Sequence, residues 1–322
     1  MRRRDFLRLA ALTAASPLAA RAQQTARIPR LGILLFTRED LGVINPMLRG
    51  LEALGYVDGK TVAIEYRDAG ADYARLPSVA DELVRLNPDV IFSYGGEQAP
   101  ILKRATSTIP IVVVVSNDPV ATGLVESLAR PGGNITGLTY ISDQLAGKVV
   151  DLLKRAPPSV SRVAVLWNPN HTDPEFRETS RIAPSLSVKL QSLEVRKADD
   201  FDDAFQAGMR EKAEALIALG SRLMFLHRQQ IGDFAAQNQL ILVGTPAWIT
   251  TVGGLFSYGA NVVEMNRLAA GYIDKILKGA KPVDMPMQQP ATFKLVIDLK
   301  SAKTFGFTLP PSLLAVADEV IE

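Results

Sequence analysis

The chain has 322 residues, of which 47% are hydrophobic, and its formal net charge is +2. This length and apolar content suffice for two packed lobes, and the near-neutral charge excludes the strongly basic surface of a nucleic-acid-binding protein. No cysteine occurs, so disulfides are excluded and stability must come from a packed core.

The first residues have the pattern of a cleavable export signal. Arginines at positions 2 to 4 precede a weakly apolar stretch at 9–20, and Ala20-Arg21-Ala22 places small residues around a cleavage point. The apolar stretch is shorter than the roughly 20 residues that span a bilayer. The pattern therefore predicts a signal peptide over residues 1–22 and no membrane anchor.

The signal also predicts where the protein goes. Residues 3–7 (RRDFL) resemble a twin-arginine signal, and the general secretory route is the alternative. Lipid attachment at the mature N-terminus needs a cysteine, so we expect a periplasmic protein that is soluble and not a lipoprotein. Removal of residues 1–22 leaves 31 basic and 33 acidic side chains, a net charge of −2, and no basic tract for nucleic acid.

The first half of the remaining chain alternates short apolar runs with amphipathic stretches, which is typical of parallel strands joined by helices. Leu76, Val79, Ala80 and Leu83 share one face of such a helix. The predicted strands are 31–36, 62–66, 89–94 and 109–116.

The second half repeats the pattern. Ala146, Val149, Val150 and Leu153 mark a helix, and the predicted strands are 163–167, 193–197, 215–220, 240–245 and 255–259. Corresponding strands of the two halves lie about 130 residues apart. The sequence thus predicts one α/β layout that occurs twice, in two lobes.

Open α/β sheets bind ligands at the carboxyl ends of their strands, so the loops after the predicted strands are the candidate site. Gly95 and Gly96 should open a helix whose free N–H groups could hold a carboxylate, with Ser93 adding a hydroxyl; a tight turn alone is the alternative. The polar candidates in the second half are Asn168, Ser221 and Thr245.

Five aromatic rings lie at or just past the predicted strand ends, where they could enclose an apolar or aromatic ligand group; core packing is the alternative for each ring. They are Phe36, Tyr94, Trp167, Trp248 and Tyr258.

The two histidines and the lack of catalytic motifs argue against catalysis and metal binding. His171 and His227 are the only histidines; we expect His171 in a solvated loop and His227 within a helix on the surface. Neither has an evident acidic partner, and no serine elbow, dinucleotide fingerprint or P-loop occurs. We therefore expect no enzyme, metal or cofactor.

Four segments resemble the ABC-transporter substrate-binding family that includes tryptophan-binding proteins: 54–60 (LGYVDGK), 118–125 (DPVATGLV), 130–137 (RPGGNITG) and 310–314 (PPSLL). The resemblance runs from about residue 28 to the C-terminus. It implies a type I periplasmic binding fold, an α/β fold of two doubly wound parallel-sheet lobes joined by a three-segment hinge. One departure is Asp298, where the similar pattern has asparagine.

On that template, the implied crossings are 136–140, 258–261 and 286–293. The first lobe comprises 28–138 plus 261–288, and the second comprises 139–260 plus 289–322. Asp118 is implied to pair with a ligand ammonium, and an Asp-Pro turn is its alternative.

These patterns together predict the solute-binding component of an ABC importer. The expected ligand is an amino acid or other small carboxylate with an aromatic or apolar part, and the expected partner is an inner-membrane ABC permease. We expect a monomer without membrane insertion. A periplasmic sensor partnering a membrane receptor is the alternative, followed by an exported α/β enzyme.

Overall fold

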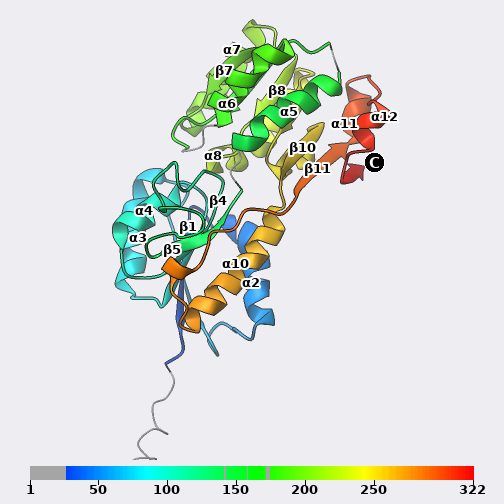
Figure 1. Cartoon of the computed structure of the whole chain (residues 1–322). Helices are drawn as coiled ribbons and strands as arrows, with labels where there is room; N and C mark the ends of the chain where they lie inside the picture. Colours follow the sequence, from blue (N-terminus) through cyan, green and yellow to red (C-terminus); the bar gives the residue numbers. More distant parts are fainter. Residues whose placement is uncertain (1–26, 141–142, 158, 172–174) are drawn as a thin grey trace, which may run out of the picture.

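The computed structural model describes residues 27–140, 143–157, 159–171 and 175–322. These residues form two α/β lobes, one above the other in Figure 1. The predicted signal peptide lies outside the described residues. No described helix combines the length and the apolar character needed to cross a membrane.

The first lobe is built on a five-stranded parallel sheet of order β2-β1-β3-β4-β5. The strands are β1 Arg30–Leu35, β2 Ala63–Asp68, β3 Val90–Tyr94, β4 Ile111–Val115 and β5 Ile135–Thr139. The helical segments are α2 Asp40–Ala53, η1 Tyr73–Arg75, α3 Leu76–Arg85, α4 Gln98–Ala105, α10 Val262–Leu277 and η5 Pro282–Asp284.

The second lobe contains a seven-stranded sheet of order β12-β11-β10-β9-β8-β6-β7, in which only the β10–β11 pair is antiparallel. Its strands are β6 Arg162–Trp167, β7 Lys189–Glu194, β8 Ala215–Ala218, β9 Ile241–Gly244, β10 Phe256–Ala260, β11 Phe293–Asp298 and β12 Glu319–Ile321. Its helical segments are α5 Asp143–Arg155, α6 Glu175–Ile182, η2 Ala183–Leu186, η3 Ala198–Asp200, α7 Phe201–Arg210, α8 Arg222–Leu226, α9 Arg228–Gln237, η4 Ala247–Val252, α11 Leu299–Thr304 and α12 Pro311–Leu314.

The predicted repetition of one layout is confirmed, because β7-β6-β8-β9-β10 has the same order as β2-β1-β3-β4-β5. One predicted strand was wrong in position. The strand expected at 193–197 is β7, Lys189–Glu194, about four residues earlier. It is an edge strand of its sheet and half of its residues are exposed, so it lacks the apolar run by which the buried strands are recognised.

Apolar side chains fill both faces of each sheet. In the first lobe, Ile33 and Phe92 belong to the core under α2 and α10, whereas Leu34 and Ile91 face the core under α3 and α4. Because successive strand residues point to opposite faces, a strand covered on both sides reads as a continuous apolar run. This explains why β4, with the sequence IVVVV, is buried at every position.

Three chain segments connect the lobes. The chain crosses after β5, at Asn261 between β10 and α10, and again in the segment that leads from η5 to β11. The first and third crossings lie side by side, since the N–H of Thr139 donates to the carbonyl of Gln288 at 2.9 Å. In Figure 1 the orange helix α10 accordingly packs on the blue helix α2 in the first lobe.

Candidate functional site

A cavity of about 300 Å³ lies between the lobes, at the carboxyl ends of the strands. The loops after β3, β4 and β5 line it from the first lobe, and the loops after β6, β8 and β9 line it from the second. The first turns of α2 and α10 complete the wall. Its lining includes Tyr94, Gly95, Gly96, Glu97, Ser116, Tyr140, His171, Glu175, Ser221, Arg222, Phe225, Thr245 and Trp248.

Gly95 and Gly96 form the turn between β3 and α4, as predicted. Gly95 has φ of +118°, and a Cβ there would lie 2.3 Å from the Oε1 of Gln98, so only glycine fits. A Cβ on Gly96 would lie 3.5 Å from the His171 ring. The turn brings the backbone of Gly95, Gly96 and Glu97, directly before α4, to the cavity wall.

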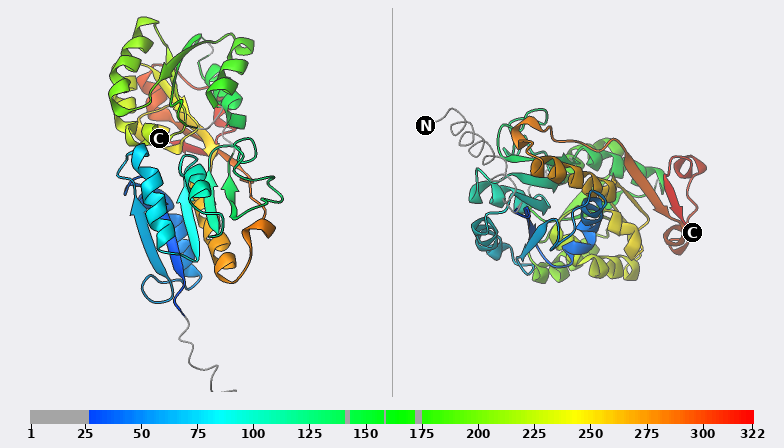
Figure 2. Two further views of the ribbon diagram at one scale, coloured as in Figure 1. Left: turned by 90° about the vertical axis from the view of Figure 1, so that its left-hand side faces the viewer. Right: turned by 90° about the horizontal axis from the view of Figure 1, so that it is seen from below.

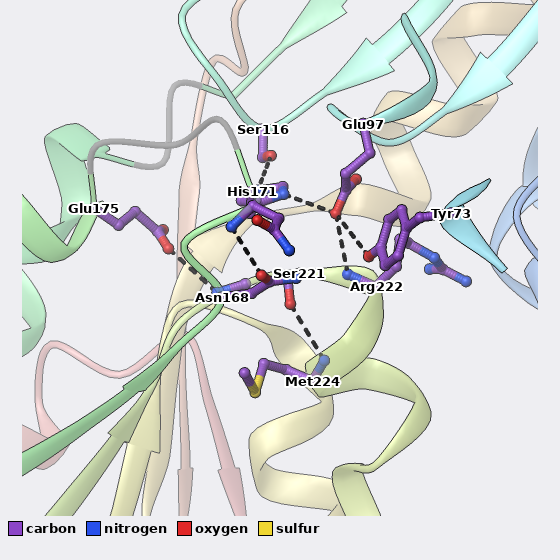
Figure 3. A network of polar contacts seen from close by, with 11 residues as sticks. Tyr73, Glu97, Ser116, Asn168, His171, Glu175, Ser221, Arg222 and Met224 are labelled. Atoms are coloured by element: carbon purple, nitrogen blue, oxygen red, sulfur yellow. Dashed lines mark hydrogen bonds and ion pairs between the residues drawn. The ribbon is translucent and has the colours of Figure 1, made fainter. Parts of the chain in front are cut away.

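Glu97, which follows this turn, is the buried carboxylate of the first-lobe wall. Its Oε1 atom contacts the Nδ1 atom of His171 at 2.8 Å and lies 3.5 Å from the Tyr73 hydroxyl and from the Arg222 backbone nitrogen (Figure 3). Its Oε2 atom is buried and accepts no hydrogen bond from the part of the chain that the structure describes.

Opposing effects set the protonation of Glu97. Burial raises the pKa of Glu97, but the charge and hydrogen bond of His171, together with backbone N–H groups, more than offset this. The pKa of Glu97 consequently lies below its usual value. The carboxyl group is therefore ionised at neutral pH, and one of its oxygens remains to be satisfied.

His171 lies at the lobe interface, and the expectation of a solvated loop residue was wrong. Its side chain is only 7% exposed, and its Nε2 atom contacts the Ser116 hydroxyl at 3.1 Å while Nδ1 contacts Glu97. The expectation that no histidine has an acidic partner was also wrong. The partner, Glu97, is 74 residues away in sequence and meets His171 only because strand ends of the two lobes face each other.

Serine, imidazole and carboxylate thus occur in the order of a hydrolase triad. Here, however, the imidazole belongs to the second lobe and both partners belong to the first (Figure 3). A catalytic triad needs a rigid scaffold around its members. This arrangement exists only while the lobes are together, so it serves as a contact between lobes.

Arg222 forms a second buried connection between the lobes. It begins α8, is 5% exposed, and forms an ion pair with Asp40, which is 1% exposed at the start of α2. Its guanidinium carbon lies 4.9 Å from the centre of the Phe225 ring. Burial lowers the pKa of Arg222 to about 10, so the side chain is still charged at neutral pH.

The second-lobe wall carries a second buried carboxylate. Glu175 is 1% exposed, and its side chain accepts hydrogen bonds from the Gly220 backbone N–H at 3.2 Å and from the Thr245 hydroxyl at 3.1 Å. Ser221 caps α8 by accepting from the Met224 N–H at 3.2 Å. The cap leaves the Ser221 hydroxyl proton available to the cavity.

The rest of the wall is largely apolar. Trp248 and Phe225 contribute rings from the second lobe, and Tyr94 contributes one from the first. Val43 on α2 and Val263 on α10 add aliphatic surface. Burial raises the pKa of Tyr94 to about 12, so this ring is uncharged. Aromatic and aliphatic surface therefore adjoins the charged groups, which suits a ligand with an apolar part.

Six of the twelve predicted site residues line the cavity: Tyr94, Gly95, Gly96, Ser221, Thr245 and Trp248. The other six lie outside it. Among these, Phe36 is buried and packs on the Tyr73 ring at 4.4 Å, Ser93 is fully buried within β3, and the Tyr258 ring lies 6.1 Å from that of Phe293. For these three, core packing describes the structure better than ligand contact.

Asp118, Trp167 and Asn168 also have structural partners. The Asp118 carboxylate accepts from the backbone N–H groups of Val120 and Ala121 at 2.8 and 3.1 Å, which is the Asp-Pro turn that was the alternative. The Trp167 ring stacks on Phe176. Asn168 is buried, and its carbonyl accepts from the His171 N–H at 3.0 Å, so it shapes the loop that presents His171.

Sequence reasoning missed the charged lining residues Glu97, Glu175, Arg222 and His171. Glu97 directly follows the glycine turn, and Arg222 follows Ser221 at a strand end, so adjacency to predicted positions was the available signal. No signal in the sequence pairs residues across the lobes. No group of side chains suited to a metal ion occurs among the residues described.

Comparison with known proteins gives consistent results. A family model described as "ABC transporter substrate binding protein" matches residues 41–321. A tyrosine-binding protein of Clostridioides difficile is 23% identical over 259 residues, which cover 80% of this chain and 74% of that protein.

Two solved structures share the fold over 91% of this chain. A conserved domain protein from Vibrio cholerae is 28% identical, is covered over its full length, and superimposes with a TM-score of 0.85. An ABC domain from Streptococcus pneumonia in complex with L-Trp is 24% identical, is covered over 99% of its length, and gives a TM-score of 0.84. The predicted fold of two parallel-sheet α/β lobes, that of type I periplasmic binding proteins, is confirmed.

Proposed function

Because the chain belongs to the family of ABC transporter substrate-binding proteins, which are not enzymes, we propose that it is the periplasmic component of an importer. Its ligand is an amino acid with an aromatic or apolar side chain, and its partner is an inner-membrane permease. The named relatives support this ligand class, since one is a tyrosine-binding protein and another was solved with L-Trp.

The observation that carries the proposal is the cavity between the lobes. Its volume of about 300 Å³ is at the lower end of the range for small-molecule sites. The buried, ionised Glu97 has an oxygen without a partner among the described residues, and a buried carboxylate oxygen in that condition is costly unless a ligand satisfies it. An ammonium group meets that need.

The other parts of an amino acid find matching groups in the same cavity. The Ser221 hydroxyl and the backbone N–H of Gly96 are donors suited to a carboxylate. Trp248 and Phe225 offer aromatic surface to the side chain. Closure of the two lobes on the ligand then gives the permease a form to recognise, by a shift of population between open and closed states.

A thermal-shift screen of amino acids and other small carboxylates tests the proposal. L-tryptophan or L-tyrosine at 100 times its dissociation constant should stabilise the protein by about 2.7 kcal/mol. Glu97→Gln should weaken binding at least tenfold, because a hydrogen bond to a charged group is worth about 1.5 to 3 kcal/mol.

The matched control is Asp118→Ala, which removes a carboxylate that lies outside the cavity and holds a turn. It should lower the melting temperature and leave the dissociation constant unchanged. If no amino acid stabilises the protein, the ligand class is wrong. If Asp118→Ala weakens binding as much as Glu97→Gln does, the location of the ammonium site is wrong.

A further inference from the structure

His171 is held between two first-lobe side chains although it belongs to the second lobe. The loop after β6 carries it, and its two ring nitrogens contact Glu97 and Ser116, which follow β3 and β4. The side chains of His171 and Glu97 are each 7% exposed. A histidine that spans an interface in this way makes both contacts only when the lobes are closed.

The contact fixes Glu97 in one orientation. His171 contacts the Oε1 atom, and the Oε2 atom is the buried oxygen that no described residue satisfies. A rotation of the carboxylate that broke the contact with His171 would also displace Oε2. The imidazole of one lobe therefore positions the candidate ammonium acceptor of the other.

We propose that His171 is a positioning residue that orients Glu97 across the lobe interface, and that His171 takes up a proton when the lobes close on the ligand. This inference rests on the proposed function for the site in which Glu97 acts. It assigns a role to a residue that does not itself need to contact the ligand.

The charged groups around Glu97 and His171 determine whether closure of the lobes favours or disfavours protonation of His171. Glu97 is the only carboxylate in direct contact with the imidazole among the described residues, and the pKa of Glu97 lies below its usual value, so Glu97 is ionised at neutral pH. Among the described residues, the other charged or titratable groups around the pair are Tyr73 from η1, Tyr94 from β3, Tyr140 after β5, Glu175 from α6, and Arg222 from α8 with its partner Asp40 from α2.

Arg222 is the one permanent cation among these groups, and Asp40 neutralises it. A bound amino acid adds no net charge, because its ammonium and carboxylate groups cancel. The charge of Glu97 therefore leaves the local field at His171 negative, which favours the protonated imidazole in the closed form. An exposed histidine is mostly protonated below about pH 6.5. Closure should then be most favourable at low pH and weaken as the pH rises and the ion pair with Glu97 loses its proton.

The first test measures the affinity for L-tryptophan by calorimetry from pH 5.5 to 8, in buffers of different ionisation enthalpy. The wild-type dissociation constant should rise about tenfold across this range, with net proton uptake on binding. His171→Gln keeps a side-chain donor but cannot titrate, so its affinity should be independent of pH and its proton uptake zero. His227→Gln, at the junction of α8 and α9, should behave like the wild type.

A second test does not depend on the ligand. The sequence has no cysteine, so Glu39→Cys and Arg228→Cys place unique thiols on an ion pair that bridges the lobes at 3.6 Å, and a short bifunctional reagent can hold the lobes closed. In ¹H–¹⁵N spectra, His171 should retain its proton to a higher pH in the cross-linked protein than in the same variant before cross-linking.

The outcomes separate the two proposals. If L-tryptophan fails to bind but His171 retains its proton in the cross-linked protein, the ligand class is wrong and the role of His171 stands. If His171→Gln keeps the pH dependence, or if cross-linking leaves the titration of His171 unchanged, the role of His171 is refuted whatever the ligand.

Discussion

Replacing Arg222 with methionine should weaken L-tryptophan binding by roughly 100-fold. The substitution leaves Asp40, which is 1% exposed, without its cationic partner in the closed form. Breaking a buried ion pair in this way costs about 3 to 5 kcal/mol. The lower end applies because Asp40 still accepts from the N–H groups of Phe36 and Thr37, and about 3 kcal/mol corresponds to roughly 100-fold.

The free-energy cost of the unpaired Asp40 carboxylate should oppose lobe closure, because in an open form water can solvate that carboxylate. Removing the charge as well, in the double variant Asp40→Asn with Arg222→Met, should bring the dissociation constant back to within about tenfold of the wild type. Isothermal calorimetry measures both values. Arg228→Met is the matched control, because it breaks an exposed bridge to Glu39 and should change affinity by less than about fivefold.

A double variant as weak as Arg222→Met alone would refute this reasoning. It would mean that Arg222 acts on the ligand directly and that its pairing with Asp40 is incidental to closure.

Three further predictions concern stability. Gly95→Ala should lower the melting temperature measured by circular dichroism, with a cost of about 2 kcal/mol or more, because φ is +118° and the new Cβ would clash with Gln98; an unchanged melting temperature would contradict this account of the turn. Tyr56 donates to Asp274, and burial and this bond raise the pKa of Tyr56 to about 12. The stabilisation from this bond is present below pH 10 and lost as the pH rises towards 12. The free energy of unfolding, measured with urea across that range, should therefore decline more steeply for the wild type than for Tyr56→Phe. Asp298→Asn should change the free energy of unfolding by less than about 0.5 kcal/mol, because either residue caps α11; a larger loss would show that the charge itself is needed.

The sequence predicted the lobes well because their signals are local. Each buried parallel strand is a short apolar run, and strands such as β4 carry that signal at every position. The edge strand β7 was misplaced because its two apolar residues, Leu190 and Leu193, are separated by polar ones and pack in different core clusters, so no apolar run marks it. The departure at Asp298 also has a local explanation, since its carboxylate caps α11 through the N–H groups of Lys300 and Ser301.

The site was predicted only in part because its contacts are not local. The turn of Gly95 and Gly96 was predicted from its position at the end of a strand and from the backbone conformation that glycine allows. Both signals come from residues adjacent in the sequence. His171 was misjudged because a polar loop sequence looks solvated until the facing lobe covers it. Trp167 shows the reverse error, since a ring at a strand end can face its own lobe and stack on Phe176.

The packing of α10 on α2 has a consequence for biosynthesis. Ile44 and Met47 of α2 are buried in the same core as Met265 and Ile273 of α10, yet roughly 200 residues separate the two helices in the chain. At a synthesis rate of about 5 to 20 residues per second, the apolar face of α2 waits roughly 10 to 40 seconds for its cover. The apolar face of α2 therefore stays exposed on the nascent chain while the second lobe is translated, and we expect a holding chaperone to bind there.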